Sequence, residues 1–450
     1  MKNRKPTLPY LLVSDGDGNI FEIKELWMCG KTLFGFRLPE PDEVIPLPYG
    51  SDVYMLPDRA PVGYDYRKKR FVRVDSYNGE RVYGVAAFVA PAYMQYYIAP
   101  YEVMTLGRDK PRTTRSFERS GITRLPLYCY SPVGWKDGTF FTTGIRIDRD
   151  KRQDLKNFDL KVIEERAQEL LKNNRKNRLI EHLVENCVFR YGCPAARNFV
   201  MGRWECPLPT SPYCNAKCVG CISEQDGSGV PCSQERIKFV PEVWEVVDVA
   251  TRHLENAPYP VVSFGQGCEG EPLMVAELLH ESILQIRKKT NRGVINLNTN
   301  GSKPEVVEKL CRAGLDSIRV SINSAQEEYY RKYYRPSGYD LGDVIETLKM
   351  VKKYGKWASI NYLIFPGFTD HSLEIDALKE LVKTTCIDMI QTRNLNIDPD
   401  WYIEELGLEE LPPDEIGLPK WVKLINKNFP DLKLGYFNPP AERMKNWNIF

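Results

Sequence analysis

Three cysteines lie within eight residues, in the run Cys214-Asn-Ala-Lys-Cys218-Val-Gly-Cys221. Thiolates are soft ligands that bind zinc and iron–sulfur clusters well, and a short loop can bring three of them to one metal site. Three ligands on a cube of four irons leave one iron without a protein ligand, and an open position of this kind is typical of catalytic metal centres. The spacing therefore predicts a metal centre that binds a further molecule.

A structural zinc site, or three cysteines packed in a core, is the alternative interpretation of the same residues. Zinc sites favour two pairs at CxxC spacing, and this chain has no second pair besides Cys218–Cys221. Histidine is also scarce near the motif, because the chain has only His182, His253, His280 and His371.

Glycines and polar residues follow three apolar runs further along the chain. The turn Gly265-Gln-Gly-Cys-Glu-Gly-Glu-Pro272 comes after residues 260–264, and Asn298-Thr-Asn-Gly301 comes after residues 294–297. Arg319-Val-Ser-Ile-Asn323 overlaps a third run. In parallel α/β sheets chemistry takes place at the carboxyl ends of the strands, so we expect these residues to meet there.

The elements that must position these motifs are parallel strands covered by helices. After Trp204, apolar runs at 260–264, 294–297, 318–322, 358–365 and 388–391 are each followed by helical periodicity. A first strand just before Cys214 brings the total to about six βα units, fewer than the eight of a closed barrel. The fold class that we predict is α/β, a partial (β/α)6 TIM-like barrel with an N-terminal β-rich domain and a short C-terminal extension.

The predicted domain organisation has four parts. Residues 1–150 are aromatic-rich, with short alternating runs and many Gly and Pro, which indicates a β-rich N-terminal domain. Residues 151–203 have helical spacing and are predicted to be a helical linker. The barrel takes residues 204–397, and residues 398–450 form an extension that we expect to wrap around the barrel and shape a substrate pocket.

The order of these motifs resembles the radical S-adenosylmethionine (radical SAM) superfamily over about residues 204–397. The resemblance rests on CxxxCxxC, the Gly-Glu-Pro turn, the Asn-Thr-Asn-Gly segment and Ser321 and Asn323. It implies a partial βα barrel in which Cys214, Cys218 and Cys221 hold a 4Fe-4S cluster. The fourth iron would bind S-adenosylmethionine (SAM), and electron transfer from the cluster would cleave SAM to methionine and a 5′-deoxyadenosyl radical.

The same resemblance implies a set of SAM-binding residues, which are Gly267, Gly270, Glu271, Pro272, Asn300, Ser321, Asn323 and Arg393. Structural roles are also open for four of them. Glu271 could cap the following helix, a role that can coexist with SAM binding. Ser321 and Asn323 could bond at a strand end, and Arg393 could pair with a surface acid, for example Asp398. Gly220 departs from the family, which commonly has an aromatic residue there that touches adenine. We therefore expect another group to cover that face.

Further cysteines lie on both sides of the motif. Cys187, Cys193, Cys206 and Cys232 are candidate ligands of an auxiliary Fe-S cluster, and core packing is the alternative. Cys268, inside the predicted SAM loop, is a fifth candidate ligand and a candidate catalytic residue that would donate a hydrogen atom to a substrate radical. The cysteines that we assign to packing are Cys29, Cys129, Cys311 and Cys386.

The composition of the chain favours one cellular compartment and argues against some classes of partner. The N-terminus has too little apolar sequence for a signal peptide, and no apolar stretch reaches the roughly 20 residues of a membrane span. We therefore expect a cytoplasmic protein with reduced thiols and no membrane contact. A net charge of +2 gives no field that would attract nucleic acid, so a small molecule or a peptide is the favoured substrate over RNA.

The resemblance also implies an external electron donor such as ferredoxin or flavodoxin. Two other functions stay open at this point. One is a non-catalytic scaffold that binds zinc or a cluster, and the other is an electron-transfer protein that keeps the cluster without cleaving SAM.

Overall fold

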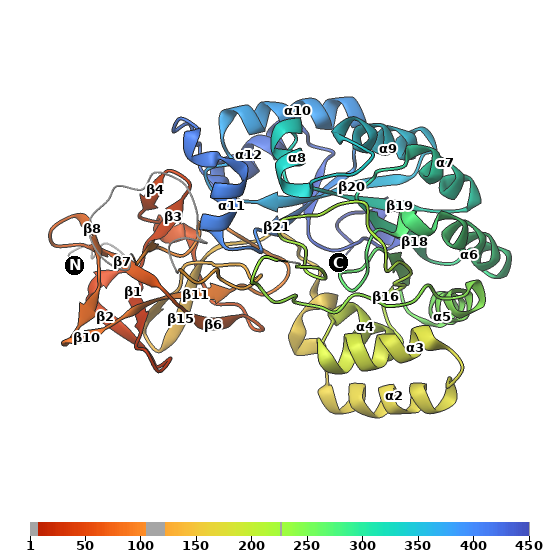
Figure 1. The fold of residues 1–450 in the computed structure, drawn as a ribbon, viewed down its shortest axis with the longest axis horizontal. Helices are drawn as coiled ribbons and strands as arrows, with labels where there is room; N and C mark the ends of the chain where they lie inside the picture. The colour runs from red at the N-terminus through yellow and green to blue at the C-terminus, as the bar shows by residue number, and fades with distance from the viewer. Residues whose placement is uncertain (1–7, 105–121, 226, 450) are drawn as a thin grey trace.

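The computed structural model describes residues 8–104, 122–225 and 227–449. Figure 1 shows two main parts that lie side by side, a β-rich region in red and orange and a curled sheet surrounded by helices in green and blue. Of the helices that the structure describes, none combines the length and the hydropathy needed to span a membrane.

The β-rich region consists of short strands of the N-terminal third, which confirms the predicted character of this part of the chain. The strands are β1 (Tyr10–Ser14), β2 (Ile20–Trp27), β3 (Gly30–Thr32), β4 (Gly35–Arg37), β5 (Val44–Pro46), β6 (Asp52–Leu56), β7 (Arg59–Asp65), β8 (Arg70–Arg73), β9 (Ser76–Tyr77), β10 (Glu80–Arg81), β11 (Tyr83–Phe88), β12 (Tyr93–Gln95), β13 (Tyr101–Val103), β14 (Gly134–Lys136) and β15 (Thr139–Arg146). Among the described residues, eleven of them form one sheet whose pairs are antiparallel.

Helices follow in the segment that was predicted to be helical. They are α2 (Leu160–Asn173), α3 (Arg178–Glu181), η4 (His182–Arg190) and α4 (Pro194–Val200), preceded by the single turns η2 (Lys151–Gln153) and η3 (Leu155–Asn157). Asp159 begins α2 by accepting hydrogen bonds from the N–H groups of Lys161 and Val162, which have no partner inside the helix. The segment η4 has π-helical winding, which is rare in proteins.

The sheet that follows is parallel and has seven strands in chain order. They are β16 (Glu205–Pro207), β17 (Val261–Phe264), β18 (Val294–Thr299), β19 (Ser317–Ile322), β20 (Trp357–Ile364), β21 (Met389–Asn394) and β22 (Lys433–Gly435). This confirms the α/β partial barrel and corrects its size, since the predicted six strands are joined by β22 from the C-terminal extension. Residues 398–450 therefore contribute the last strand of the sheet. The predicted domain boundaries stay predictions.

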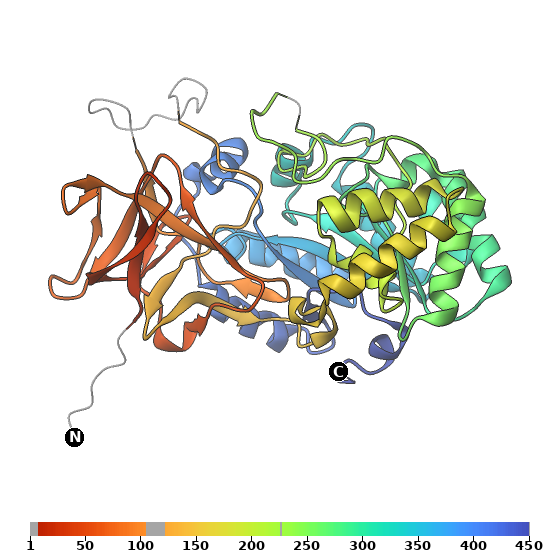
Figure 2. The same cartoon turned by 90° about the horizontal axis from the view of Figure 1, so that it is seen from below.

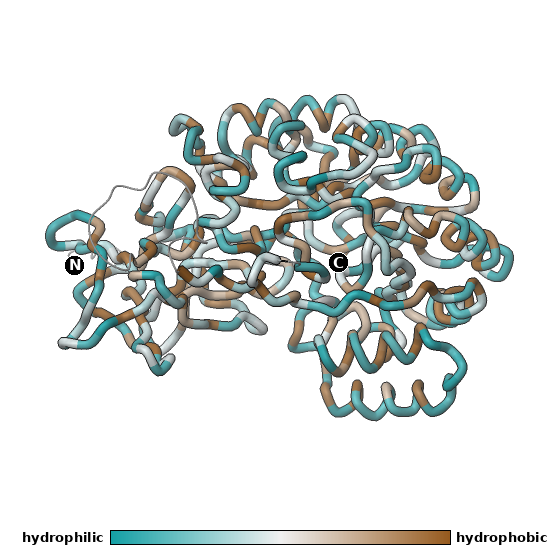
Figure 3. The backbone as a smooth tube through the Cα atoms, in the orientation of Figure 1, coloured by the Kyte–Doolittle hydropathy of each residue, from teal (hydrophilic) through white to brown (hydrophobic). Residues whose placement is uncertain are grey.

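Helices cover the outside of this sheet in Figures 1 and 2. They are α5 (Val243–Asn256), α6 (Ala276–Lys289), α7 (Pro304–Ala313), α8 (Glu327–Tyr334), α9 (Leu341–Lys353), α10 (Ser372–Thr385), α11 (Pro399–Leu406), α12 (Leu418–Asn428) and α13 (Ala441–Lys445), with single turns η1 (Pro41–Glu43), η5 (Pro272–Val275) and η6 (Leu408–Glu410) elsewhere in the chain. The tubes of these helices alternate between teal and brown in Figure 3, as expected for helices with one buried face.

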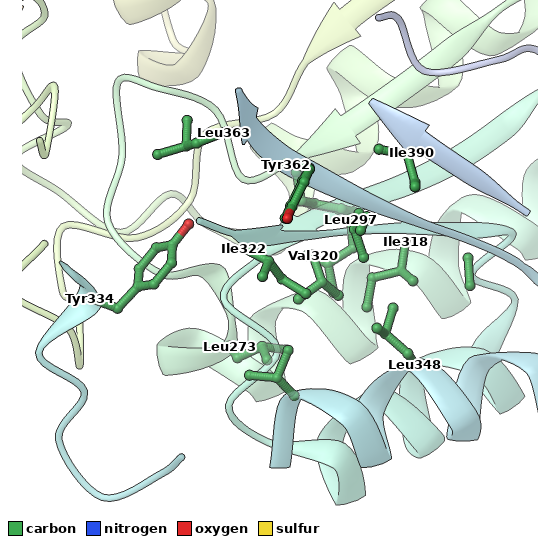
Figure 4. Packing of buried hydrophobic residues seen from close by; sticks show 14 of the residues in the cluster. Leu273, Leu297, Ile318, Val320, Ile322, Tyr334, Leu348, Tyr362, Leu363 and Ile390 are labelled. Carbon is green, nitrogen blue, oxygen red and sulfur yellow. The ribbon is translucent and has the colours of Figure 1, made fainter. Parts of the chain in front are cut away.

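The sheet has an apolar outer face and a polar concave face. Ile318 and Val320 of β19 are fully buried, and Figure 4 shows them near Leu348 of α9. Arg319, which lies between them, points the opposite way, because side chains alternate along a strand. On that side Asn438, which follows β22, donates a hydrogen bond of 2.9 Å to Glu205 of β16. The first and last strands are thus bridged, which indicates a sheet curled almost into a barrel.

The β-rich region contacts the barrel at the carboxyl ends of β20 and β21. The Leu33 N–H donates to the carbonyl of Pro366 at 2.9 Å, and the N–H of Gln95 donates to the Asn394 side chain at 2.9 Å. Chemistry in such folds takes place at this end of the sheet. The β-rich region therefore lies beside the place where the motifs of the sequence are expected to meet.

Candidate functional site

Cys214, Cys218 and Cys221 share one loop that follows β16 at the carboxyl end of the sheet, and each is partly buried. Burial raises the pKa of the Cys214 thiol to about 11, and burial with the neighbouring Cys221 and Cys214 thiols raises the pKa of Cys218 well above its usual value. A bound metal would stabilise the thiolate form of these side chains, since a coordinating thiol is deprotonated outright. This donor set fits an iron–sulfur cluster.

The main chain of this loop is fixed on the end of α8. The N–H groups of Lys217 and Val219 donate to the carbonyls of Tyr334 and Tyr333 at 3.0 and 2.9 Å. A Cβ at position 220 would lie 2.7 Å from the Tyr333 hydroxyl, so the close approach requires Gly220. The resembled family commonly has an aromatic residue at the position of Gly220, and here the ring of Tyr333 lies beside that position. The sequence alone had not identified Tyr333.

The loop after β17 runs against the segment that enters the cysteine loop. The N–H of Gly270 donates to Ser211 O and that of Glu271 to Tyr213 O, both at 2.7 Å. A Cβ on Gly270 would lie only 2.1 Å from Tyr213 O. Gly265, at the start of this loop, has φ +76°, and its Cβ would meet Asn298 O at 1.7 Å. Two glycines thus allow the loop after β17 to touch the segment after β16 and the end of β18.

Glu269 holds these loops together, a role that sequence reasoning had missed. Its buried carboxylate accepts from the N–H groups of Thr210 and Ser211 at 2.7 and 3.0 Å. It also accepts from the N–H groups of Gly265 and Gln266 at 2.6 and 2.8 Å. The sequence signal was an acid between Gly267 and Gly270, and the sequence alone assigned it no role.

Glu271 caps the turn η5, which is the structural role predicted for it alongside SAM binding. Its carboxylate accepts from the Leu273 N–H at 3.0 Å at the start of η5, and from the Asn300 N–H at 2.8 Å. Burial raises its pKa to about 6. The Asn300 side chain in turn donates to Asn215 beside Cys214 at 2.7 Å. Pro272 begins η5, and a Cβ on Gly267 would collide with Ile222 of the segment after the cysteines.

Ser321 and Asn323 are at the carboxyl end of β19, as predicted. The amide nitrogen of Asn323 donates to Tyr329 O at 3.1 Å, whereas its buried Oδ1 has no hydrogen-bond partner among the described residues. A buried acceptor without a partner costs free energy unless a ligand or water donates to it. Asn323 therefore fits a position where a bound molecule offers a donor.

Two arginines lie on the concave face of the sheet. Arg393 donates to Asn361 Oδ1 at 2.8 Å and to Tyr436 O at 2.9 Å, so its suggested pairing with Asp398 was wrong. Arg319 donates to Gln391 at 2.8 Å, and burial together with the charge of Arg393 lowers its pKa to about 9. Two guanidinium groups near one another in a buried place favour an anionic partner.

Asp398 instead binds Arg59 of the β-rich region at 2.8 Å, and both side chains are fully buried. Asp398, which was the suggested partner of Arg393, thus connects the β-rich region to the segment after β21 instead.

The remaining cysteines are arranged differently from the predicted auxiliary set. The Cys187 sulfur lies 3.5 Å from that of Cys268, whereas the Cys206 thiol donates to Pro207 O and Cys232 is exposed. The hydrogen bond to Cys268 lowers the pKa of Cys187 to about 6 against the effect of burial. Cys193 begins α4, and its N–H donates to Cys187 O at 2.7 Å.

The chain is similar in sequence to several known proteins. Residues 208–378 match the model of the radical SAM superfamily. The FeMo cofactor biosynthesis protein NifB of Chlorobaculum tepidum is 25% identical over 245 residues, which are 50% of this chain and 55% of that protein. A probable GTP 3′,8-cyclase of Thermococcus kodakarensis is 33% identical over 104 residues, 22% of this chain and 32% of that protein.

The chain thus spans between about a third and just over half the length of these curated relatives. Among solved structures, SuiB of Streptococcus suis is 15% identical, covers 70% of each chain and has a TM-score of 0.34.

Proposed function

Because this chain belongs to the radical SAM superfamily through its residues 208–378, we propose that it is an enzyme that reductively cleaves SAM at a 4Fe-4S cluster. Cys214, Cys218 and Cys221 hold the cluster. When bound, the cluster and SAM supply a 5′-deoxyadenosyl radical, which starts radical chemistry on a substrate. The chain's own residues position these groups and keep water away from them.

One observation supports this proposal above the others: the cysteine loop is hydrogen-bonded to the loops after β17 and β18. Gly270 binds Ser211 on one side of the cysteines, and Asn300 binds Asn215 inside the motif. A zinc-binding turn needs no such neighbours, whereas a cluster with an open iron needs polar loops beside it. A structural zinc scaffold explains the thiols but not this arrangement.

The SAM-binding residues of the proposal follow from the same loops. The main chain at Gly267, Gly270 and Pro272 lines the amino-acid end of SAM, while Glu271 positions the loop by capping η5 and binding Asn300. Ser321 and the free Oδ1 of Asn323 face the carboxylate or ribose end. Tyr333 supplies the aromatic face that Gly220 lacks.

The substrate that we favour is a small anionic molecule. Arg319 and Arg393 place two guanidinium groups on the concave face, where Glu205 is the acid that offsets the charge at Arg319. Guanidinium groups match carboxylates and phosphates in geometry. The names of the relatives, a FeMo cofactor biosynthesis protein and a GTP 3′,8-cyclase, point to small-molecule chemistry as well. A peptide or RNA substrate is the alternative.

The β-rich region closes one side of the site in this proposal. Arg124 donates to Ser228 O at 2.8 Å, beyond the cysteine loop, and Gln95 contacts Asn394 at the end of β21. In this proposal the part of the β-rich region between these two contacts keeps water and quenching agents away from a radical. Electrons come from a carrier of the ferredoxin or flavodoxin class, and the reducing cytoplasm is the compartment that keeps the thiols available.

The test is anaerobic reconstitution with iron and sulfide, followed by dithionite and SAM. We expect at least about four irons and four sulfides per chain, and 5′-deoxyadenosine as product. Replacing Cys214, Cys218 and Cys221 together by Ala should abolish the product, whereas replacing the exposed Cys232 by Ala should not.

A protein that takes up no iron contradicts the proposal. A protein that binds the cluster and forms no 5′-deoxyadenosine supports the electron-transfer function instead.

A further inference from the structure

A second group of metal-binding side chains lies outside the proposed cluster site. One ligand atom each from His182, Cys187 and Cys268 lies within 4.8 Å of the others. It is the one group of three or more His, Cys, Asp or Glu residues with that spacing among the residues that the structure describes. The two cysteines are almost fully buried, at 3% and 4% exposure, so their position reflects the fold and not surface mobility.

The winding of η4 brings two of these ligands together. His182 and Cys187 are five residues apart, and in an α-helix that separation turns side chains about 140° away from each other. The i→i+5 hydrogen bonds of a π-helix bring such residues to the same side, and π-helical turns occur frequently at functional sites. η4 is π-helical from His182 to Arg190. Its unusual winding is therefore what aligns the imidazole with the thiol.

The imidazole has a buried nitrogen that the protein does not satisfy. Nε2 of His182 is inaccessible to water and has no hydrogen-bond partner among the described residues. A buried polar atom without a partner is destabilising, and a neutral imidazole nitrogen is a common metal ligand. Phe239 closes one side of the ring, with its centroid 6.3 Å away at a perpendicular angle. The ring is thus held in an apolar place where a metal would satisfy it.

We propose that His182, Cys187 and Cys268 bind a single zinc-class ion, separate from the 4Fe-4S cluster. The distance between the two sulfurs is 3.5 Å. Two sulfurs bound to one tetrahedral zinc lie about 3.8 Å apart, because each Zn–S bond is about 2.3 Å. A disulfide requires about 2.05 Å, so the observed separation fits a shared ion far better than a bond. Two thiolates also neutralise the ion's double charge.

The ion would anchor the loop after β17 to the helices that precede the barrel. Cys268 is in that loop, two residues before Gly270, and its carbonyl accepts from the Ile237 N–H at 2.7 Å. Cys187 and His182 belong to η4, far away in sequence. One ion thus fixes the base of the proposed SAM loop from outside the barrel, which is a structural role and does not depend on SAM cleavage.

The experiment uses the full chain with Cys214, Cys218 and Cys221 replaced by Ala, so that the cluster is absent. We expect about one zinc per chain by elemental analysis, and X-ray absorption at the zinc edge should show sulfur at about 2.3 Å with nitrogen at about 2.0 Å. Adding Cys187→Ala or His182→Ala should lower the zinc content about tenfold or more. Cys206→Ala, which removes a buried thiol that points elsewhere, is the matched control and should retain zinc.

The X-ray absorption measurement is made on a chain that keeps all three proposed zinc ligands. The test therefore holds even where a ligand variant fails to fold. Three results overturn the proposal: a cluster-free chain without metal, a Cys187–Cys268 disulfide in non-reducing peptide mapping, or iron and sulfide bound to these residues. Because the zinc is measured in a chain that cannot cleave SAM, its absence and the absence of 5′-deoxyadenosine are separate outcomes.

Discussion

At the scale of single residues, the contact between the cysteine loop and the loop after β17 depends on the absence of a side chain at Gly270. We predict that Gly270→Ala lowers the free energy of unfolding by about 1–3 kcal/mol, because its Cβ would lie 2.1 Å from the carbonyl oxygen of Tyr213. That oxygen is main chain and accepts from Glu271, so it cannot move aside without breaking the bond. Iron loading and 5′-deoxyadenosine formation should fall with it. Urea denaturation and iron analysis measure both effects.

Gly16→Ala is the matched control for this variant. The atom nearest to its Cβ would be a Tyr83 ring carbon at 3.9 Å, an ordinary contact. The control should keep wild-type stability and iron content. Equal stability of the two variants would show that the loops after β16 and β17 are not packed as described.

Local chemistry of the site was predictable from sequence, and its long-range supports were not. Three thiols at CxxxCxxC spacing must share a loop, whatever surrounds them, so Cys214 to Cys221 could be identified directly. Glu269 bonds to Thr210, which is 59 positions away in the sequence. Tyr333 contacts Gly220, which is over 100 positions away. A single sequence contains no information on such pairs. Cys187 and Cys268 were both noticed, but their proximity depends on a fold that spacing cannot specify.

At the scale of elements, five strands of the barrel were predictable because each is an apolar run with a helix after it, and a sixth was expected just before the cysteine motif. β22 was missed, since Lys433–Gly435 contributes three residues in a segment rich in Pro and charge. Its strand character comes from pairing with β21 and not from its own composition. The winding of η4 was also beyond reach, because hydrophobic periodicity over nine residues does not distinguish an α-helix from a π-helix.

The docking of α5 on the barrel makes stability depend on pH through His253. Its Nε2 bonds to Trp204 O at 2.7 Å, and burial lowers its pKa to about 4 from 6.5. Between these two values the unfolded chain binds a proton that the folded chain excludes. The contribution is therefore fully present above pH 6.5 and is lost as pH falls towards 4, by up to about 3 kcal/mol.

We predict that the difference in unfolding free energy between the wild type and His253→Gln shrinks by about this amount from about pH 7 to about pH 4. Urea denaturation at several pH values, with both proteins measured in the same buffers, isolates the histidine from the carboxyl groups that titrate in the same range. Parallel curves for the two proteins would contradict a buried, neutral imidazole at this position.

At the scale of the whole molecule, no specific contact between the β-rich region and the barrel could be predicted from the sequence. Two contacts fix this placement: the N–H of Leu33 donates to the carbonyl of Pro366 after β20, and Asp398 at the start of the C-terminal extension binds Arg59. The two members of each pair are over 300 residues apart in the sequence. All four are of residue types that are common throughout proteins, so nothing in the sequence marks them as partners.

The buried Arg59–Asp398 pair gives the test of this arrangement. We predict that Asp398→Asn lowers the free energy of unfolding by about 3–5 kcal/mol, because it leaves a fully buried guanidinium without its closest carboxylate. The double variant Arg59→Met, Asp398→Asn should be less destabilised, since the buried charge is gone as well. Glu405→Gln, which removes the partly exposed partner of Arg335, should cost under about 1 kcal/mol. If Asp398→Asn behaved like Glu405→Gln in urea denaturation, the pair would be solvated, and the β-rich region would not be docked on the barrel as it is described.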